Sequence, residues 1–82
     1  MEIAVVGTPE FTLGFQLAGV TRLHNPADLE ETATVLRSLM DTPEVGIVVI
    51  DSSDLTQMPE KLRMQLSESI TPTVLGLSLI HI

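Results

Sequence analysis

The sequence has no cysteine, no tryptophan and no tyrosine, and only two phenylalanines among its 82 residues. The lack of cysteine excludes disulfide bonds, cysteine–zinc sites and thiol catalysis. The scarcity of aromatic rings argues against a site that stacks on sugars or nucleic-acid bases. A chain of this length forms one small domain with a limited hydrophobic core.

Basic residues are also scarce. Four Lys and Arg stand against eleven Asp and Glu, which gives a net charge of −7. A protein binds nucleic acids or anionic lipid surfaces through clustered Lys and Arg residues, so we expect neither as a partner of this chain. The apolar run Ile3–Val6 follows the acidic Glu2 and is too short for a signal peptide. No apolar stretch approaches the ~20 residues that cross a bilayer, so we expect no membrane insertion.

Short apolar segments alternate with segments of helical periodicity. The expected strands are 3–6, 20–24, 45–50 and 73–77, and the expected helices are 9–18, 26–41 and 54–69. The β-α-β-α-β-α-β order predicts an α/β fold of Rossmann-like or receiver-like type, with a four-stranded parallel sheet and helices on both faces. Segment 45–50 is the most apolar and is expected at the centre of the sheet, whereas 20–24 is the weakest strand.

The helix boundaries carry recognisable capping signals. Thr8 is suited to cap the first helix, with Pro9 at its first position, and Asn25 is the expected cap of the second. Residues 51–54 are polar and predict an exit loop after the third strand. Pro59 is expected to restart the third helical segment after a first turn.

The end of the sequence departs from the expected pattern. A fourth parallel strand is normally covered by a further helix, whereas residues 78–82 are apolar, uncapped and short. We therefore predict one domain over residues 1–77, a short atypical tail over 78–82 and a missing C-terminal helix. One face of the sheet would then be partly bare and prone to self-association.

Motifs for catalysis or cofactor binding are weak. The loop after the first strand offers only Gly7 where a dinucleotide fingerprint needs three glycines, and Glu10 would repel phosphate. The two histidines, His24 and His81, have no partner at metal-ligand spacing. We therefore expect no catalytic, cofactor-binding or metal-binding residues, no cofactor and no enzymatic activity of the chain itself.

Asp51 leaves one signalling alternative open. It follows the third strand, as the phosphoacceptor does in response-regulator receivers. Receivers also need an acidic pair after the first strand and a lysine after the fifth, but Glu10 stands alone and Lys61 falls on an expected helix. The simpler interpretation is that Asp51 and Asp54 cap and solvate a strand–helix loop.

Three of the four basic residues are the candidate contacts for a protein partner. Lys61 and Arg63 lie close together on the third helical segment, and Arg22 lies on the weakest strand. In an acidic protein a local basic group marks either a solvated face or a contact for an acidic partner. Both interpretations stay open at this point.

One long motif and three shorter ones resemble a known family. Residues 7–20 (GTPEFTLGFQLAGV) are similar to the start of the F subunit of archaeal-type (A-type or A/V-type) rotary ATP synthases. Residues 45–50, 59–63 and 69–74 resemble that family's third strand, third helix and entry to the fourth strand. The resemblance runs to about residue 77, where the family continues into a Gly-rich linker and a C-terminal helix that this sequence does not match.

The resemblance implies a non-catalytic subunit of the central stalk, the rotor that couples transmembrane ion flow to ATP synthesis. Its implied partners are the coiled-coil D subunit of the stalk and the catalytic headpiece. The implied location is the cytoplasmic side of the cell membrane, as a peripheral component of the complex. Such a subunit works through a packed protein contact and not through an active site of its own.

Overall fold

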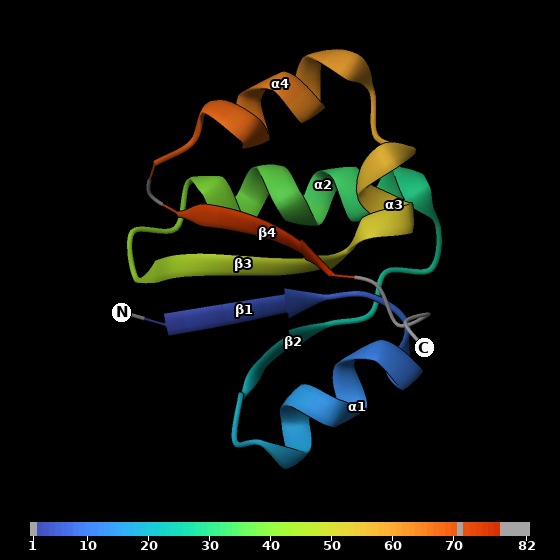
Figure 1. Ribbon diagram of the computed structural model, residues 1–82, viewed down its shortest axis with the longest axis vertical. Coiled ribbons are helices and arrows are strands. Elements are labelled where there is room, and N and C mark those ends of the chain that lie inside the picture. The colour runs from blue at the N-terminus through green and yellow to red at the C-terminus, as the bar shows by residue number, and fades with distance from the viewer. Residues whose placement is uncertain (1, 71, 78–82) are drawn as a thin grey trace.

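The four strands form one parallel sheet in the order β2-β1-β3-β4 (Figure 1). The computed structural model describes residues 2–70 and 72–77. The strands are β1 (Glu2–Val6), β2 (Arg22–His24), β3 (Val45–Asp51) and β4 (Thr73–Leu77). The helices are α1 (Pro9–Leu17), α2 (Leu29–Met40), α3 (Ser52–Thr56) and α4 (Glu60–Glu68). The predicted α/β class, the parallel sheet and the central place of β3 are confirmed, and β2 is an edge strand.

The two inner strands are apolar because both of their faces are buried. Ala4, Val5 and Val6 of β1 are each 0% exposed. Ala4 and Val6 belong to the core under α2 and α4, whereas Val5 packs with Phe11 of α1 on the opposite face. Burial on both faces explains why the sequence of these strands is continuously apolar and does not alternate. Helices therefore cover both faces of the sheet, as predicted.

The first helix begins as predicted, but the second does not. The Thr8 hydroxyl accepts a hydrogen bond from the Phe11 N–H at 3.3 Å, which caps α1. The expected cap at Asn25 is wrong, because α2 is capped by Asp28, whose carboxylate accepts from the Glu31 N–H at 2.8 Å.

The side chain of Asn25 forms other hydrogen bonds, which explains why it does not cap α2. Its side-chain amide donates to the Gly7 carbonyl and to the Thr12 hydroxyl, both at 2.9 Å. Because these donors hold the loop after β2 against the loop after β1 and the start of α1, the side chain is not free to cap α2. The cap lies three positions later than predicted, at Asp28.

The prediction of a polar loop after β3 is also wrong. Asp51 is the last residue of β3, and its carboxylate accepts hydrogen bonds from the Ser53 N–H and hydroxyl, both at 3.0 Å. This capping starts the short helix α3 at once. The break at Pro59 is confirmed, since it separates α3 from α4 and divides the expected helical segment into two helices.

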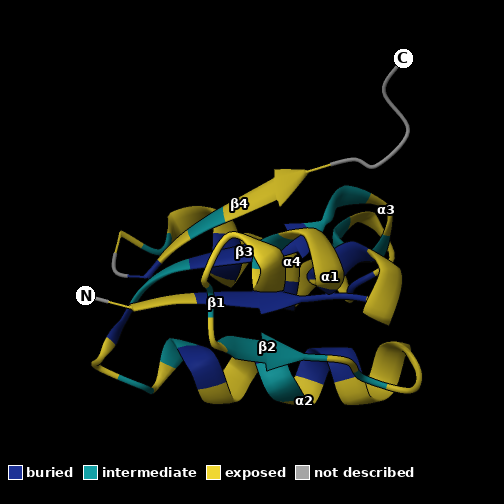
Figure 2. Cartoon of the chain, turned by 90° about the horizontal axis from the view of Figure 1, so that it is seen from below, coloured by how far each residue is buried: buried dark blue, intermediate teal, exposed yellow. Residues whose placement is uncertain are grey.

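On the α1 side of the sheet, the exposed strand is β4, whereas Val49 of β3 is 5% exposed and packs with Phe11 of α1. Thr73, Leu75 and Leu77 of β4 are in register with Ile47, Val49 and Asp51 of β3 and share their face. Leu75 and Leu77 are 44% and 43% exposed, and Figure 2 shows β4 as largely exposed at the edge of the sheet. The tail predicted over 78–82 and the missing helix lie outside the described residues. No helix in the described part of the chain is long and apolar enough to cross a membrane.

Substitutions of two glycines, Gly7 and Gly14, can test how tightly α1 packs on the sheet. A Cβ atom added at Gly7 would lie 2.6 Å from Cδ2 of the buried Phe11, whereas one added at Gly14 would meet no atom within 4 Å. We expect Gly7→Ala to lower the free energy of unfolding by about 1–3 kcal/mol through overpacking. Gly14→Ala should raise it by about 1 kcal/mol, because alanine favours the helix. Urea unfolding followed by circular dichroism measures both, and equal effects at the two sites would contradict this packing.

Candidate partner-binding surface

The three candidate contact residues lie on two separate surfaces. Arg22 belongs to β2 at one edge of the sheet, whereas Lys61 and Arg63 belong to α4, which packs beside β4 at the other edge (Figure 1). Lys61 and Arg63 stand on either side of the buried Leu62 in α4, and Arg22 lies apart from both. A single small contact cannot include all three.

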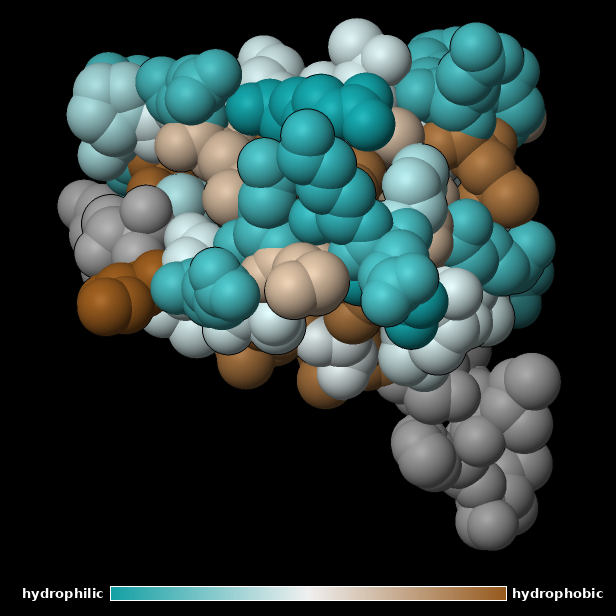
Figure 3. Space-filling view, turned by 90° about the horizontal axis from the view of Figure 1, so that it is seen from above, coloured by the Kyte–Doolittle hydropathy of each residue, from teal (hydrophilic) through white to brown (hydrophobic). Residues whose placement is uncertain are grey.

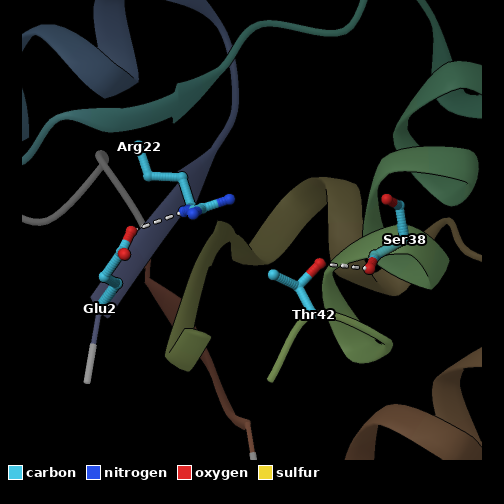
Figure 4. A network of polar contacts seen from close by, with 4 residues as sticks. All are labelled: Glu2, Arg22, Ser38 and Thr42. Atoms are coloured by element: carbon cyan, nitrogen blue, oxygen red, sulfur yellow. Dashed lines mark hydrogen bonds and ion pairs between the residues drawn. The ribbon is translucent and has the colours of Figure 1, made fainter. Parts of the chain in front are cut away.

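Arg22 forms an ion pair with another residue of the same chain. Its Nε donates to a carboxylate oxygen of Glu2 at 2.9 Å, across the neighbouring strands β1 and β2 (Figure 4). This hydrogen bond and the charge of Glu2 raise the pKa of Arg22 above its ordinary value. The two side chains are 32% and 50% exposed, so the pair is a weak surface interaction that water screens.

Helix α4 offers the more available cations. Leu62 and Leu66 are buried in the core, so the remaining positions of the helix point outward. Lys61 and Arg63 are exposed, and within residues 2–70 and 72–77 neither forms an ion pair. Met64 lies next to Arg63 and is 55% exposed. Figure 3 looks onto this side of the molecule and shows a mainly hydrophilic surface with hydrophobic side chains at its borders.

A groove of about 320 Å³ lies between α3, α4 and β4. It is lined by Leu55, Thr56, Arg63, Leu66, Ser67 and Val74. Arg63 is the one charged residue of this lining. The groove can therefore hold an apolar side chain of a partner while Arg63 pairs with a carboxylate beside it.

Sequence reasoning found Arg63 but missed this groove. The sequence places Leu55 and Leu66 in one helical segment that Pro59 restarts, and it does not indicate that a space opens between the two parts. The break at Pro59 places them on two helices instead, and Val74 closes the space between them from β4. Pro59 was the available signal, but the angle between two helices cannot be derived from a proline.

Asp51 does not form a receiver-like centre in this structure. Its carboxylate caps α3, and its neighbour Asp54 has a raised pKa because of burial and, second, because of the charge of Asp51. Across the described residues, no group of three or more His, Cys, Asp or Glu side chains is placed to hold a metal ion. The magnesium-dependent phosphorylation of a receiver thus gains no support here.

Comparison with known proteins decides the family. Residues 3–80 match the family model described as ATP synthase (F/14-kDa) subunit. The chain belongs to this family. The A-type ATP synthase F subunit of Methanosarcina mazei is 42% identical over 77 residues, covering 94% of this chain and 76% of the relative. The corresponding F subunit of Methanocorpusculum labreanum is 42% identical over 74 residues, covering 90% and 74%.

A solved structure shares both the family and the fold. The crystal structure of the V-type ATP synthase F subunit of Archaeoglobus fulgidus matches with a TM-score of 0.86 at 31% identity, covering 94% of this chain and 96% of that one. The resemblance found in the sequence is therefore confirmed. This member of the family is a non-catalytic accessory subunit of a rotary ATP synthase.

His24 makes the stability of this ATP synthase subunit depend on pH. Its Nε2 atom is buried without a hydrogen-bond partner among the described residues. Burial and, second, the nearby charge of Arg22 lower the pKa of His24 below its ordinary value of 6.5. The unfolded chain therefore binds a proton more readily than the folded one. The stability is fully present above the unfolded pKa and is lost as the pH falls below it.

We expect the free energy of unfolding to decrease between about pH 7.5 and pH 5.5. His24→Gln should make this decrease shallower, because glutamine does not titrate. Urea titrations of both proteins at each pH provide the comparison. Since all other titratable groups are shared, equal slopes would show that His24 has no part in the pH dependence.

Proposed function

We propose that this chain is a central-stalk, or rotor, subunit of an A-type ATP synthase and helps couple transmembrane ion flow to ATP synthesis. Its direct partners are the coiled-coil D subunit and the catalytic headpiece. One domain, residues 1–77, carries the contact. The subunit acts as a peripheral component on the cytoplasmic side of the membrane.

The observation that carries this proposal is the surface of α4 with its adjoining groove. A stalk subunit transmits torque, so its contact must resist sliding. An apolar pocket that holds a partner side chain, with a charge at its border, meets this requirement. The groove supplies the apolar walls through Leu55, Leu66 and Val74, and Arg63 supplies the charge.

Electrostatics favour α4 over β2 as the binding surface. The chain carries a net charge of −7, so most of its surface repels an acidic partner. α4 is neutral overall, since Lys61 and Arg63 offset Glu60 and Glu68, and within the described residues its cations form no ion pair. The charge of Arg22 is balanced by Glu2. An acidic segment of a helical partner is therefore directed to α4, with one of its apolar side chains entering the groove.

Arg63→Glu should lower the affinity for the D subunit by at least about tenfold, because it places a carboxylate against an acidic partner. Arg22→Glu is the matched control, since it makes the same charge change on the other surface. Co-expression with an archaeal-type D subunit, then size-exclusion chromatography and calorimetry, measures both variants against the parent chain. The parent should elute as a 1:1 complex.

The possible results test the rotor role and the choice of binding surface separately. If the parent chain forms no complex with the D subunit, the rotor proposal is rejected. If the parent binds and Arg63→Glu binds equally well, the rotor role stands and α4 is excluded. If only Arg22→Glu weakens binding, the contact lies at β2.

A further inference from the structure

The outer edge of β4 is unprotected. Within residues 2–70 and 72–77, β4 is hydrogen-bonded to one strand only, β3. Its sequence, TVLGL, contains no charged residue and no proline. Its pairing with β3 is regular over all five residues, without a bulge. Natural edge strands usually carry a charge, a proline or a bulge that prevents pairing with another chain.

The opposite edge of the same sheet shows the usual protection. β2 has only three residues, and two of them are Arg22 and His24. A short strand with charged or titratable side chains is a poor template for another strand. The difference between the two edges directs strand pairing to β4.

The side chains of β4 make this edge self-complementary. Thr73, Leu75 and Leu77 lie on the bare side of the sheet, next to Ile47 and Val49 of β3. Two copies related by a two-fold axis through Leu75 would place Leu75 against Leu75 and Thr73 against Leu77. This arrangement keeps Thr73, Leu75 and Leu77 of both copies on one face and Val74 of both copies on the other, which the pleat of a continuous sheet requires.

We propose that β4 pairs antiparallel with β4 of a second copy of this chain, with the two-fold axis at Leu75. The two parallel sheets then join into one continuous sheet, and the exposed Leu75 and Leu77 of the two copies become neighbours. The main-chain N–H and C=O groups along the free edge of each β4 gain partners. This inference does not depend on the stalk role proposed above.

A second copy fits this edge better than a helix or an unfolded segment. A helix has no free main-chain groups along its length to satisfy an edge strand. An unfolded segment must lose conformational entropy to become a strand, whereas β4 of a second copy is already extended. A contact through one five-residue strand is smaller than the roughly 600 Å² per partner of the smallest stable interfaces, so the dimer is weak and depends on concentration.

The charge of the chain sets the salt dependence. Each copy carries a net charge of −7, so two copies repel each other at low ionic strength. Salt screens this repulsion but leaves apolar contacts and main-chain hydrogen bonds in place. We expect the association constant to rise several-fold between about 0.05 and 0.5 M salt. A dimer held by ion pairs would show the opposite trend.

The first test compares a variant with a positive charge on β4 with a control variant that carries the same charge on α1. Leu75→Lys and Leu17→Lys change the net charge equally and replace exposed leucines, 44% and 80% exposed. Sedimentation equilibrium of the full chain between about 10 µM and 1 mM should show a dimer for the parent and for Leu17→Lys. Leu75→Lys should lower the association constant by about tenfold or more, because two lysines then face each other. Circular dichroism verifies that each variant is folded.

The second test reports the register and does not require a destabilising change. Because the chain has no cysteine, one introduced cysteine can crosslink only to its own copy in a second chain. Leu75→Cys should form a disulfide dimer under mild oxidation, since facing residues lie about 5 Å apart. Thr73→Cys should not, because its two copies would lie about 13 Å apart along the strands.

Three results would overturn the proposal. The first is a parent chain that remains monomeric up to about 1 mM at high salt. The second is a dimer that folded Leu75→Lys leaves unchanged. The third is equal crosslinking of Leu75→Cys and Thr73→Cys, which indicates contact without this register, such as stacking of the bare sheet faces.

Discussion

The burial of β1 and β3 on both faces is the constraint on which the rest of the structure depends. Ala4, Val5 and Val6 are completely buried, although successive side chains of a strand point to opposite sides. Their continuous apolar sequence is stable only if both sides of the sheet are covered. Helices must therefore pack on each face, and parallel strands joined through helices meet that requirement.

The covering is complete on one face and partial on the other. α2 and α4 pack over the face of Ala4 and Val6, while on the opposite face α1 packs over β1, β2 and β3 but leaves β4 exposed. The side of the sheet that carries β4 therefore differs from the rest. It combines an uncovered apolar face, an unprotected edge and the groove beside α4. Within an acidic chain, this is where an apolar groove lies beside an exposed arginine that forms no ion pair among the described residues.

The sequence predicted the candidate site in part. Lys61 and Arg63 could be singled out because only four basic residues exist in the chain and these two are close together. The groove next to Arg63 could not be predicted, because its walls come from α3, α4 and β4. Arg22 was a candidate because it is basic and lies on the weakest strand, and only the pairing of β1 with β2 shows that it forms an ion pair with Glu2.

By itself the sequence determined the fold class, the order of the elements, the parallel sheet and the family, because these follow from hydrophobic periodicity, capping signals and a contiguous motif. The tertiary structure decided which hydrogen bonds each polar side chain forms. Asn25 and Asp28 are both good caps locally, but only the loop that packs beside Asn25 makes it a donor to Gly7 and Thr12. Local preferences are encoded within a few residues of the chain. The partner of a polar side chain depends on segments that only folding brings together.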